Sequence, residues 1–189
     1  MKLLKERILK DGKVIGEDIL RVDSFLNHQL DIGLFNEIGK EFKRRFKGND
    51  INKILTIETS GIGIACIVAQ YFDVPVVFAK KHQGTNMDMN TYEAEVFSFT
   101  KNTTYNIRVA KEYIKSDDKI LIIDDFLAQG KAVDGLMEIA NQGNAEVVGI
   151  GIVIEKAFQN AREQIESKGL KLESLAIIDG FKDGNVIFK

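Results

Sequence analysis

Four consecutive apolar residues, Ile120 to Ile123, constrain the fold of this chain more than any other stretch. A strand with one exposed face alternates polar and apolar residues, so an unbroken apolar run predicts a strand buried on both faces, as in a parallel sheet. Two acids, Asp124 and Asp125, end the run, a short loop over residues 126–131 follows, and residues 132–140 have the pattern of a helix. This order predicts an α/β fold with a ligand site at the carboxyl end of the strand.

The loop after the two acids is suited to a phosphate group. Its glycine, Gly130, lets the backbone adopt a positive φ or approach a ligand closely. The backbone N–H groups of residues 128–132 can turn toward a phosphate, whose charge the dipole of the next helix favours. The neighbouring carboxylates repel each other unless ribose hydroxyls or a divalent cation satisfies them. An Asp that only caps the next helix is the alternative, and this stretch alone does not decide between the two.

A second stretch repeats the order of strand, turn and helix. Residues 51–57 predict a strand, Glu58 to Gly61 a turn, and residues 62–72 an apolar helix. Lys80 and Lys81 end a further short apolar run. Taken singly, the turn could be an ordinary connection between a strand and a helix, and the two lysines could be a solvated charge pair. Because the carboxyl ends of parallel strands lie at one edge of a sheet, we expect both features to face a diphosphate.

The segment after the two lysines predicts a lid. Residues 83–91 are polar and aperiodic, whereas residues 95–100 and 104–109 alternate polar and apolar side chains. This pattern predicts a long loop that leads into a pair of antiparallel strands beside the parallel sheet. Long loops on rigid scaffolds often close over active sites, so a lid is the functional interpretation.

Lys156 and Phe158 follow a long buried strand predicted over residues 145–154. A lysine at the carboxyl end of a strand can donate to an exocyclic oxygen of a heterocycle while an aromatic ring stacks on it. A salt-bridged lysine and a core phenylalanine are the alternative, and the pattern alone does not exclude it.

Composition narrows the class of protein. The 189 residues suffice for one domain with a sizeable core, and 44% apolar with 29% charged residues is typical of a soluble globular protein. A net charge of −2 disfavours nucleic acid as the main partner. The amino terminus lacks the apolar core of a signal peptide, and no apolar run approaches the ~18 residues of a membrane helix. We therefore expect a cytoplasmic protein whose single cysteine, Cys66, is a buried free thiol.

The stretch over residues 120–132 resembles the phosphoribosyl pyrophosphate motif of the type I phosphoribosyltransferases, with its hydrophobic run, two acids, two spacer residues and small loop. The resemblance implies that Asp124 and Asp125 are catalytic and hold the ribose hydroxyls. It also implies that the loop holds the 5-phosphate through Ala128, Gln129, Gly130, Lys131 and Ala132.

The same resemblance implies a pyrophosphate-binding turn. The backbone N–H groups of Thr59, Ser60 and Gly61 would lie near the diphosphate, beside Lys80 and Lys81. The implied cofactor is Mg²⁺, held mainly by phosphoribosyl pyrophosphate, and no protein residue is assigned to it as a certain ligand.

Four positions depart from the family pattern, one of which is Lys131 in the phosphate loop. Gln129 stands where many members have threonine, and Lys80 stands where arginine is common. Ala128 stands where hypoxanthine-guanine members carry an acid that is their proposed general base. The resemblance therefore supplies no general base for this chain.

Taken end to end, the chain is similar to the bacterial branch of that family that acts on xanthine, most clearly over residues 22–29, 119–128 and 149–156. This implies one domain over residues 1–189, a mainly parallel twisted sheet flanked by helices, and a small hood from the N-terminal segment and the C-terminal region. It further implies a homodimer in purine salvage that makes xanthosine 5′-monophosphate and pyrophosphate. The implied xanthine-binding residues are Leu20, Asn27, Lys156 and, as a stacking partner, Phe158.

Two alternatives remain at this point. One is transfer to guanine or hypoxanthine, because a single oxygen-recognising lysine does not separate these bases from xanthine. The other is a regulator that senses phosphoribosyl pyrophosphate and binds DNA, as purine repressors do. Only eighteen residues precede Ile19, which is too few for a DNA-binding domain, so we expect an enzyme.

Overall fold

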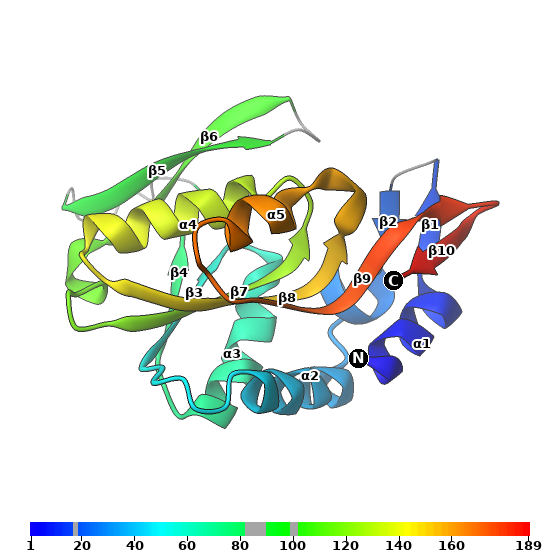
Figure 1. The fold of residues 1–189 in the computed structure, drawn as a ribbon, viewed down its shortest axis with the longest axis horizontal. Helices are drawn as coiled ribbons and strands as arrows, with labels where there is room; N and C mark the ends of the chain where they lie inside the picture. The colour runs from blue at the N-terminus through cyan, green and yellow to red at the C-terminus, as the bar shows by residue number, and fades with distance from the viewer. Residues whose placement is uncertain (17–18, 82–89, 99–101) are drawn as a thin grey trace.

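The computed structural model describes residues 1–16, 19–81, 90–98 and 102–189, and its centre is a twisted sheet (Figure 1). Within these residues the sheet has six strands in the order β10-β9-β8-β7-β3-β4. All neighbours run parallel except β10, which pairs antiparallel with β9. The sheet is therefore mainly parallel, as predicted. Its strands are β3 (Lys53–Ile57), β4 (Val76–Ala79), β7 (Lys119–Leu127), β8 (Glu146–Lys156), β9 (Leu172–Lys182) and β10 (Asn185–Phe188).

Helices cover both faces of this sheet (Figure 1). One face carries α2 (Ile32–Arg45) and α3 (Ser60–Phe72), and the other carries α4 (Lys131–Gln142) and α5 (Ala161–Glu166). An antiparallel pair, β5 (Thr91–Ser98) with β6 (Thr103–Ala110), lies over α4. The short elements η2 (Lys111–Tyr113) and η3 (Ala157–Gln159) complete this part of the chain.

The central strand β7 divides its apolar side chains between two cores. Leu121 and Ile123 belong to the core under α2 and α3, whereas Ile120 and Ile122 belong to the core under α4. All four side chains are fully buried, which confirms that the strand is covered on both faces.

The glycines of β8 let an aromatic helix face approach the sheet. A Cβ added at Gly149 would lie 2.5 Å from the Phe46 ring, and one at Gly151 would lie 2.8 Å from the Phe42 ring. Real Cβ atoms do not approach other atoms so closely, so close packing requires glycine at both positions.

A small hood stands at one end of the sheet and joins the two ends of the chain (Figure 1). It comprises α1 (Lys2–Asp11), β1 (Lys13–Ile15), β2 (Ile19–Arg21) and the π-helix η1 (Asp23–Asn27), beside β9 and β10. The amino group of Met1 donates to the carbonyl of Leu175, and Nζ of Lys5 donates to the carbonyl of Lys189 over 2.5 Å. The predicted hood is confirmed.

Two details of the predicted elements are wrong. Strand β7 does not end at the acids but continues to Leu127, because it stays paired with β8 up to Leu127 opposite Glu155. The connecting loop is therefore residues 128–130. Cys66 is exposed, not buried, since α3 turns Ile64, Ala65, Val68 and Ala69 inward and leaves Cys66 on its outer side.

The predicted lid, residues 83–91, lies outside the described residues except for its last two positions. Among the helices that the structure describes, none has the length and apolar character needed to cross a bilayer.

Candidate active site

The strand order of the sheet reverses between β3 and β7. From β3 the chain passes outward to β4, and it then returns to the opposite side of β3 as β7, from which β8 and β9 follow outward. In open α/β sheets, ligands bind outside the carboxyl ends of the strands at such a switch point. Both turns that the sequence singled out, after β3 and after β7, begin there.

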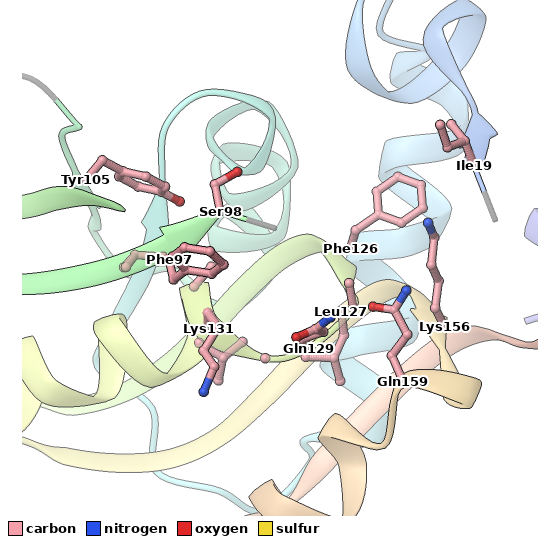
Figure 2. A pocket seen from close by; sticks show the side chains of 15 residues that line it. Ile19, Phe97, Ser98, Tyr105, Phe126, Leu127, Gln129, Lys131, Lys156 and Gln159 are labelled. Atoms are coloured by element: carbon pink, nitrogen blue, oxygen red, sulfur yellow. The ribbon is translucent and has the colours of Figure 1, made fainter. Parts of the chain in front are cut away.

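A cavity of about 470 Å³ opens beyond the carboxyl end of β7 (Figure 2). Its wall combines the loop after β7, the first turn of α4, the ends of β5 and β8, and single residues from β2, β6 and η3. The residues are Ile19, Val96, Phe97, Ser98, Tyr105, Phe126, Leu127, Ala128, Gln129, Gly130, Lys131, Ala132, Val133, Lys156 and Gln159.

The phosphate loop, residues 128–132, lies entirely in the wall of this cavity. Gly130 has φ +78°, the left-handed conformation that an amino acid with a Cβ adopts at a cost, and a Cβ there would lie 3.2 Å from the Cβ of Ala161. In the described part of the chain, no backbone acceptor takes the N–H groups of residues 129–132. Free N–H groups at the positive end of α4 are what an anion requires.

The two acids lie beside the cavity, on the strand that leads into the loop. Asp124 is 4% exposed and Asp125 is half-buried. The N–H of Asp125 donates to Oδ1 of Asp124 over 2.9 Å, and the N–H of Phe126 donates to Oδ1 of Asp125 over 2.9 Å. The cavity wall itself begins one residue later, at Phe126.

Burial makes this acid pair costly to ionise. Loss of hydration raises the pKa of Asp124, and the charge of Asp125 raises it further. Loss of hydration also raises the pKa of Asp125, and the nearby positive charge of Lys81 lowers the pKa of both acids. A buried pair of this kind is stabilised by a ligand that brings hydroxyl donors or positive charge.

The turn after β3 contacts the acid pair directly. A Cβ added at Gly61 would lie 2.2 Å from Oγ1 of Thr56 and 3.1 Å from Oδ1 of Asp124. Only glycine fits there, and this lets the start of α3, which Thr59 caps, pack against Asp124 at Gly61. The peptide bond between Glu58 and Thr59 is cis.

The two lysines after β4 occupy different surroundings. The N–H of Lys81 donates to the carboxylate of Glu58, and its ammonium lies 5.2 Å from the ring centroid of Tyr105, a residue of the cavity wall. Lys80 is held by backbone bonds to Arg108, and its ammonium lies 6.0 Å from the ring of Phe78 on the edge strand. Lys81 is thus the lysine that faces the acid pair.

Of the residues that the resemblance assigned to the base, Lys156 lines the cavity and the other three do not. The side chain of Leu20 is buried in the core and its strand pairs with β1, with Leu20 opposite Val14, whereas Asn27 is exposed at the end of η1. Phe158 is 40% exposed and meets the ring of Phe181 edge-on at 5.9 Å. The aromatic ring that the fold does bring beside Lys156 is Phe126 (Figure 2).

The end of β8 that carries Lys156 is held by an ion pair whose acid, Glu155, is buried. Arg162 donates to the two carboxylate oxygens of Glu155 over 2.9 and 2.6 Å, and the hydroxyl of Ser174 donates to the same carboxylate. Glu155 is 1% exposed. A bidentate pair with this geometry fixes the backbone next to Lys156.

Sequence reasoning missed Phe126, Gln159, Ile19 and the β5–β6 residues of the wall. Phe126 was assigned to a loop, and only its place in β7 brings its ring to the cavity. Gln159 could have been proposed from the sequence, because it is a polar residue only three positions after Lys156.

The site fits a magnesium ion that is held mainly by its ligand. Among the described residues, no group of three or more His, Cys, Asp or Glu side chains converges as a metal site. The acid pair offers carboxylate oxygens, the ligand type that Mg²⁺ prefers, and Mg²⁺ commonly takes one or two protein carboxylates together with substrate phosphates.

Comparisons with known proteins agree with this geometry. The family model described as Phosphoribosyl transferase domain matches residues 22–182. The xanthine phosphoribosyltransferases of Clostridium novyi (strain NT) and Clostridium tetani (strain Massachusetts / E88) are 69% and 65% identical to this chain over the full length of both chains. That of Ruminiclostridium cellulolyticum is 60% identical and covers 100% of this chain and 99% of its own.

Solved structures share the fold. Adenine phosphoribosyltransferase from Trypanosoma brucei, in complex with AMP, pyrophosphate and ribose-5-phosphate, has a TM-score of 0.79 at 16% identity and covers 96% of this chain and 82% of its own. The enzyme from Rhodothermus marinus has a TM-score of 0.75 at 18% identity, with 94% and 100% covered. The chain therefore belongs to the phosphoribosyltransferase family, on the branch that the xanthine phosphoribosyltransferases form.

Proposed function

We propose that this protein transfers the 5-phosphoribosyl group from phosphoribosyl pyrophosphate to xanthine, giving xanthosine 5′-monophosphate and pyrophosphate. One observation carries the proposal: a single cavity of about 470 Å³ has the phosphate loop in one part of its wall and Lys156 in another. A nucleotide needs both, since its phosphate requires an anion site and its base requires a polar anchor.

Lys156 anchors the base in this proposal. Its ammonium donates to an exocyclic oxygen of the purine, while Phe126 supplies an apolar surface for the ring. Leu20 through its backbone and Asn27 through its amide complete the recognition on the hood side. The stacking role of Phe158, whose ring meets Phe181 edge-on and does not line the cavity, requires its ring to turn toward the base.

Asp124 and Asp125 hold the ribose. In the reaction, N9 of the purine attacks the anomeric carbon as pyrophosphate leaves, and the ribose ring passes through a state with oxocarbenium character. The proton that the imidazole ring of the purine loses passes to solvent. The carboxylates accept hydrogen bonds from the two ribose hydroxyls, and their negative charge favours the cationic ring. The burial of Asp124 reduces the screening of this stabilisation by water.

The turn after β3 receives the diphosphate. Backbone N–H groups of Thr59, Ser60 and Gly61 and the positive charges of Lys80 and Lys81 stabilise the negative charge that grows on the leaving group. Mg²⁺, with Asp124 or Asp125 as its protein ligand, supplies further charge neutralisation at the diphosphate when it is bound.

The cellular setting belongs to the same proposal. We infer one domain over residues 1–189 that works as a homodimer in cytoplasmic purine salvage. Transfer to guanine or hypoxanthine is the second candidate, because all three bases carry the 6-oxygen that Lys156 is suited to recognise.

The test is pyrophosphate release from phosphoribosyl pyrophosphate and Mg²⁺, with xanthine, guanine, hypoxanthine and adenine offered separately. We expect turnover with a clear lead for xanthine. Faster turnover of another base than of xanthine would overturn the choice of base. Binding of phosphoribosyl pyrophosphate without turnover of any base would favour a regulator that senses phosphoribosyl pyrophosphate.

Lys156→Ala tests the anchor. We expect the KM for xanthine to rise by roughly tenfold or more, with little change in the KM for phosphoribosyl pyrophosphate, because only the base loses a charge-assisted hydrogen bond. Lys168→Ala is the matched control, since Lys168 pairs with Asp134 on the surface over 2.8 Å and does not line the cavity. An equal rise of both KM values would remove Lys156 from base recognition.

A further inference from the structure

We infer that Gln159 sets the choice among oxopurines by reading the substituent at C2 of the base. This inference rests on the proposed function and deepens it. Lys156 alone leaves the choice open, because xanthine, guanine and hypoxanthine carry the same oxygen at C6 and differ at C2, where they carry oxygen, an amino group and hydrogen.

Gln159 lines the same cavity as Lys156. Lys156 is the N-terminal cap of the 3₁₀ turn η3, and Gln159 is its last residue. Lys156 has non-helical backbone angles, φ −95° and ψ 87°, so the side on which it lies is not set by 3₁₀ geometry. The structure nevertheless brings both residues to the cavity wall, and Figure 2 shows both side chains extending in the direction of Phe126. Phe158, between them, lines no part of it.

The amide of Gln159 is available to a ligand. The side chain is half-buried in the cavity wall, and no hydrogen bond of its amide to any other described residue exists. By contrast, the side-chain amide nitrogen of Gln142 on α4 donates to the backbone carbonyl of Glu93 and to the carboxylate of Glu138. A polar side chain that faces a cavity with donor and acceptor both free is matched by a ligand that offers the opposite pair.

Along the N1 edge, between the 6-oxygen that Lys156 is proposed to hold and C2, xanthine offers that pair and guanine does not. The 2-oxygen of xanthine accepts a hydrogen bond and the adjacent N1–H donates one, so an amide can make two hydrogen bonds at once. At the same edge guanine presents its 2-amino group and N1–H, both donors, so only the amide oxygen of Gln159 finds a partner. Hypoxanthine has hydrogen at C2 and loses the contact to the amide nitrogen. The amide therefore favours xanthine over both competitors.

The experiment compares kcat/KM for xanthine, guanine and hypoxanthine between the parent enzyme and Gln159→Leu, which keeps the bulk and removes the amide. We expect the value for xanthine to fall by on the order of tenfold or more, as expected for one or two lost hydrogen bonds, and the value for hypoxanthine to change much less. The KM for phosphoribosyl pyrophosphate is expected to stay at the parent level.

A second variant, Gln159→Glu, replaces the donor with a second acceptor. We expect the ratio of kcat/KM for guanine over that for xanthine to rise by on the order of ten- to a hundredfold, because the carboxylate accepts from the 2-amino group and repels the 2-oxygen. Gln164→Glu is the matched control, since Gln164 is exposed on α5 and does not line the cavity. Its base ratios are expected to equal those of the parent.

The outcomes separate this inference from the proposed function. Parent turnover of a purine, with base ratios unchanged in both Gln159 variants, would overturn the inference and leave the function standing. An equal fall for all three bases would assign Gln159 a structural role and would also overturn it. No turnover of any base by the parent would overturn both together.

Discussion

The turns after β3 and after β7 share one sequence pattern, yet their glycines serve different physical needs. Gly130, after β7, is required for its backbone conformation, with φ +78°. Gly61, after β3, lies in a helix and is required for space, because a Cβ would enter the hydroxyl of Thr56 and press on the carboxylate of Asp124. Gly130 shapes the loop that we propose holds a phosphate, and Gly61 lets the start of α3 pack against Asp124.

This difference teaches that the two turns form a single site through Asp124. Asp124 is a residue of β7, and its carboxylate packs against Gly61 of α3. A change at Asp124 or Gly61 is therefore expected to disturb both turns, whereas a change at Gly130 is expected to disturb one. The predictions below test that asymmetry.

The largest effect is expected where the turns meet. Asp124→Asn combined with Asp125→Asn should lower kcat by on the order of a thousandfold, because both the ribose contacts and the negative charge near the reacting carbon are lost. The fold should remain, since an amide has nearly the same shape as a carboxylate, and circular dichroism checks this. Full activity in the double variant would remove the pair from ribose binding.

The second-largest effect is expected for Gly61→Ala. The added methyl group has to displace Thr56 and Asp124, so we expect a loss of about 1–3 kcal/mol in the free energy of unfolding, measured with denaturant. The KM for phosphoribosyl pyrophosphate should also rise, because the turn and the acid pair shift together. A variant with parent stability and parent KM would show that the two turns are not coupled.

Gly130→Ala should cost less stability and act on one turn. A left-handed conformation costs an alanine about 1–2 kcal/mol, and the binding of the 5-phosphate should weaken while the acid pair is unchanged. Gly130→Asn is the matched comparison, since asparagine tolerates this conformation better and should recover part of the loss. Equal losses for Ala and Asn would point to the contact with Ala161 as the main cause instead of φ.

The smallest effect concerns pH. The pKa of Asp124 lies well above its ordinary value of 3.8 because of burial and the charge of Asp125, so ionisation costs the ligand-free protein stability. The native state binds more protons than the unfolded state above pH 3.8, and the penalty grows as the pH rises from there toward the raised pKa. Asp124→Asn should therefore match the parent in Tm near pH 3.5 and exceed it near pH 7 without ligands. A difference in Tm that does not change with pH would contradict this account.

Patterns that depend on neighbours in the chain were predictable. The unbroken apolar run over residues 120–123 indicated a doubly covered strand, and Gly130 indicated a positive φ, because local sterics and burial decide both. A short loop between the strand and the helix was also predictable, although it comprises residues 128–130 and not the predicted 126–131.

Other features were decided by distant partners. The end of β7 depends on its pairing with β8, up to Leu127 opposite Glu155. The exposure of Cys66 depends on which side of α3 meets the core. The strand order depends on the return of β7 to the side of β3 opposite β4. None of these partners is near in sequence.

The sequence by itself determined the fold class, the two units of strand, turn and helix, and the acid pair, because each follows from periodicity, charge and backbone sterics within short stretches of the chain. The tertiary structure decided what these pieces face: that Gly61 rests on Asp124, that Phe126 and Gln159 join Lys156 around one cavity, and that the ring of Phe158 turns to Phe181 instead. The physical reason is that the direction of a side chain depends on which strands pair and which helices cover them. The pairing of strands and the placement of helices depend in turn on the burial of apolar side chains from the whole chain.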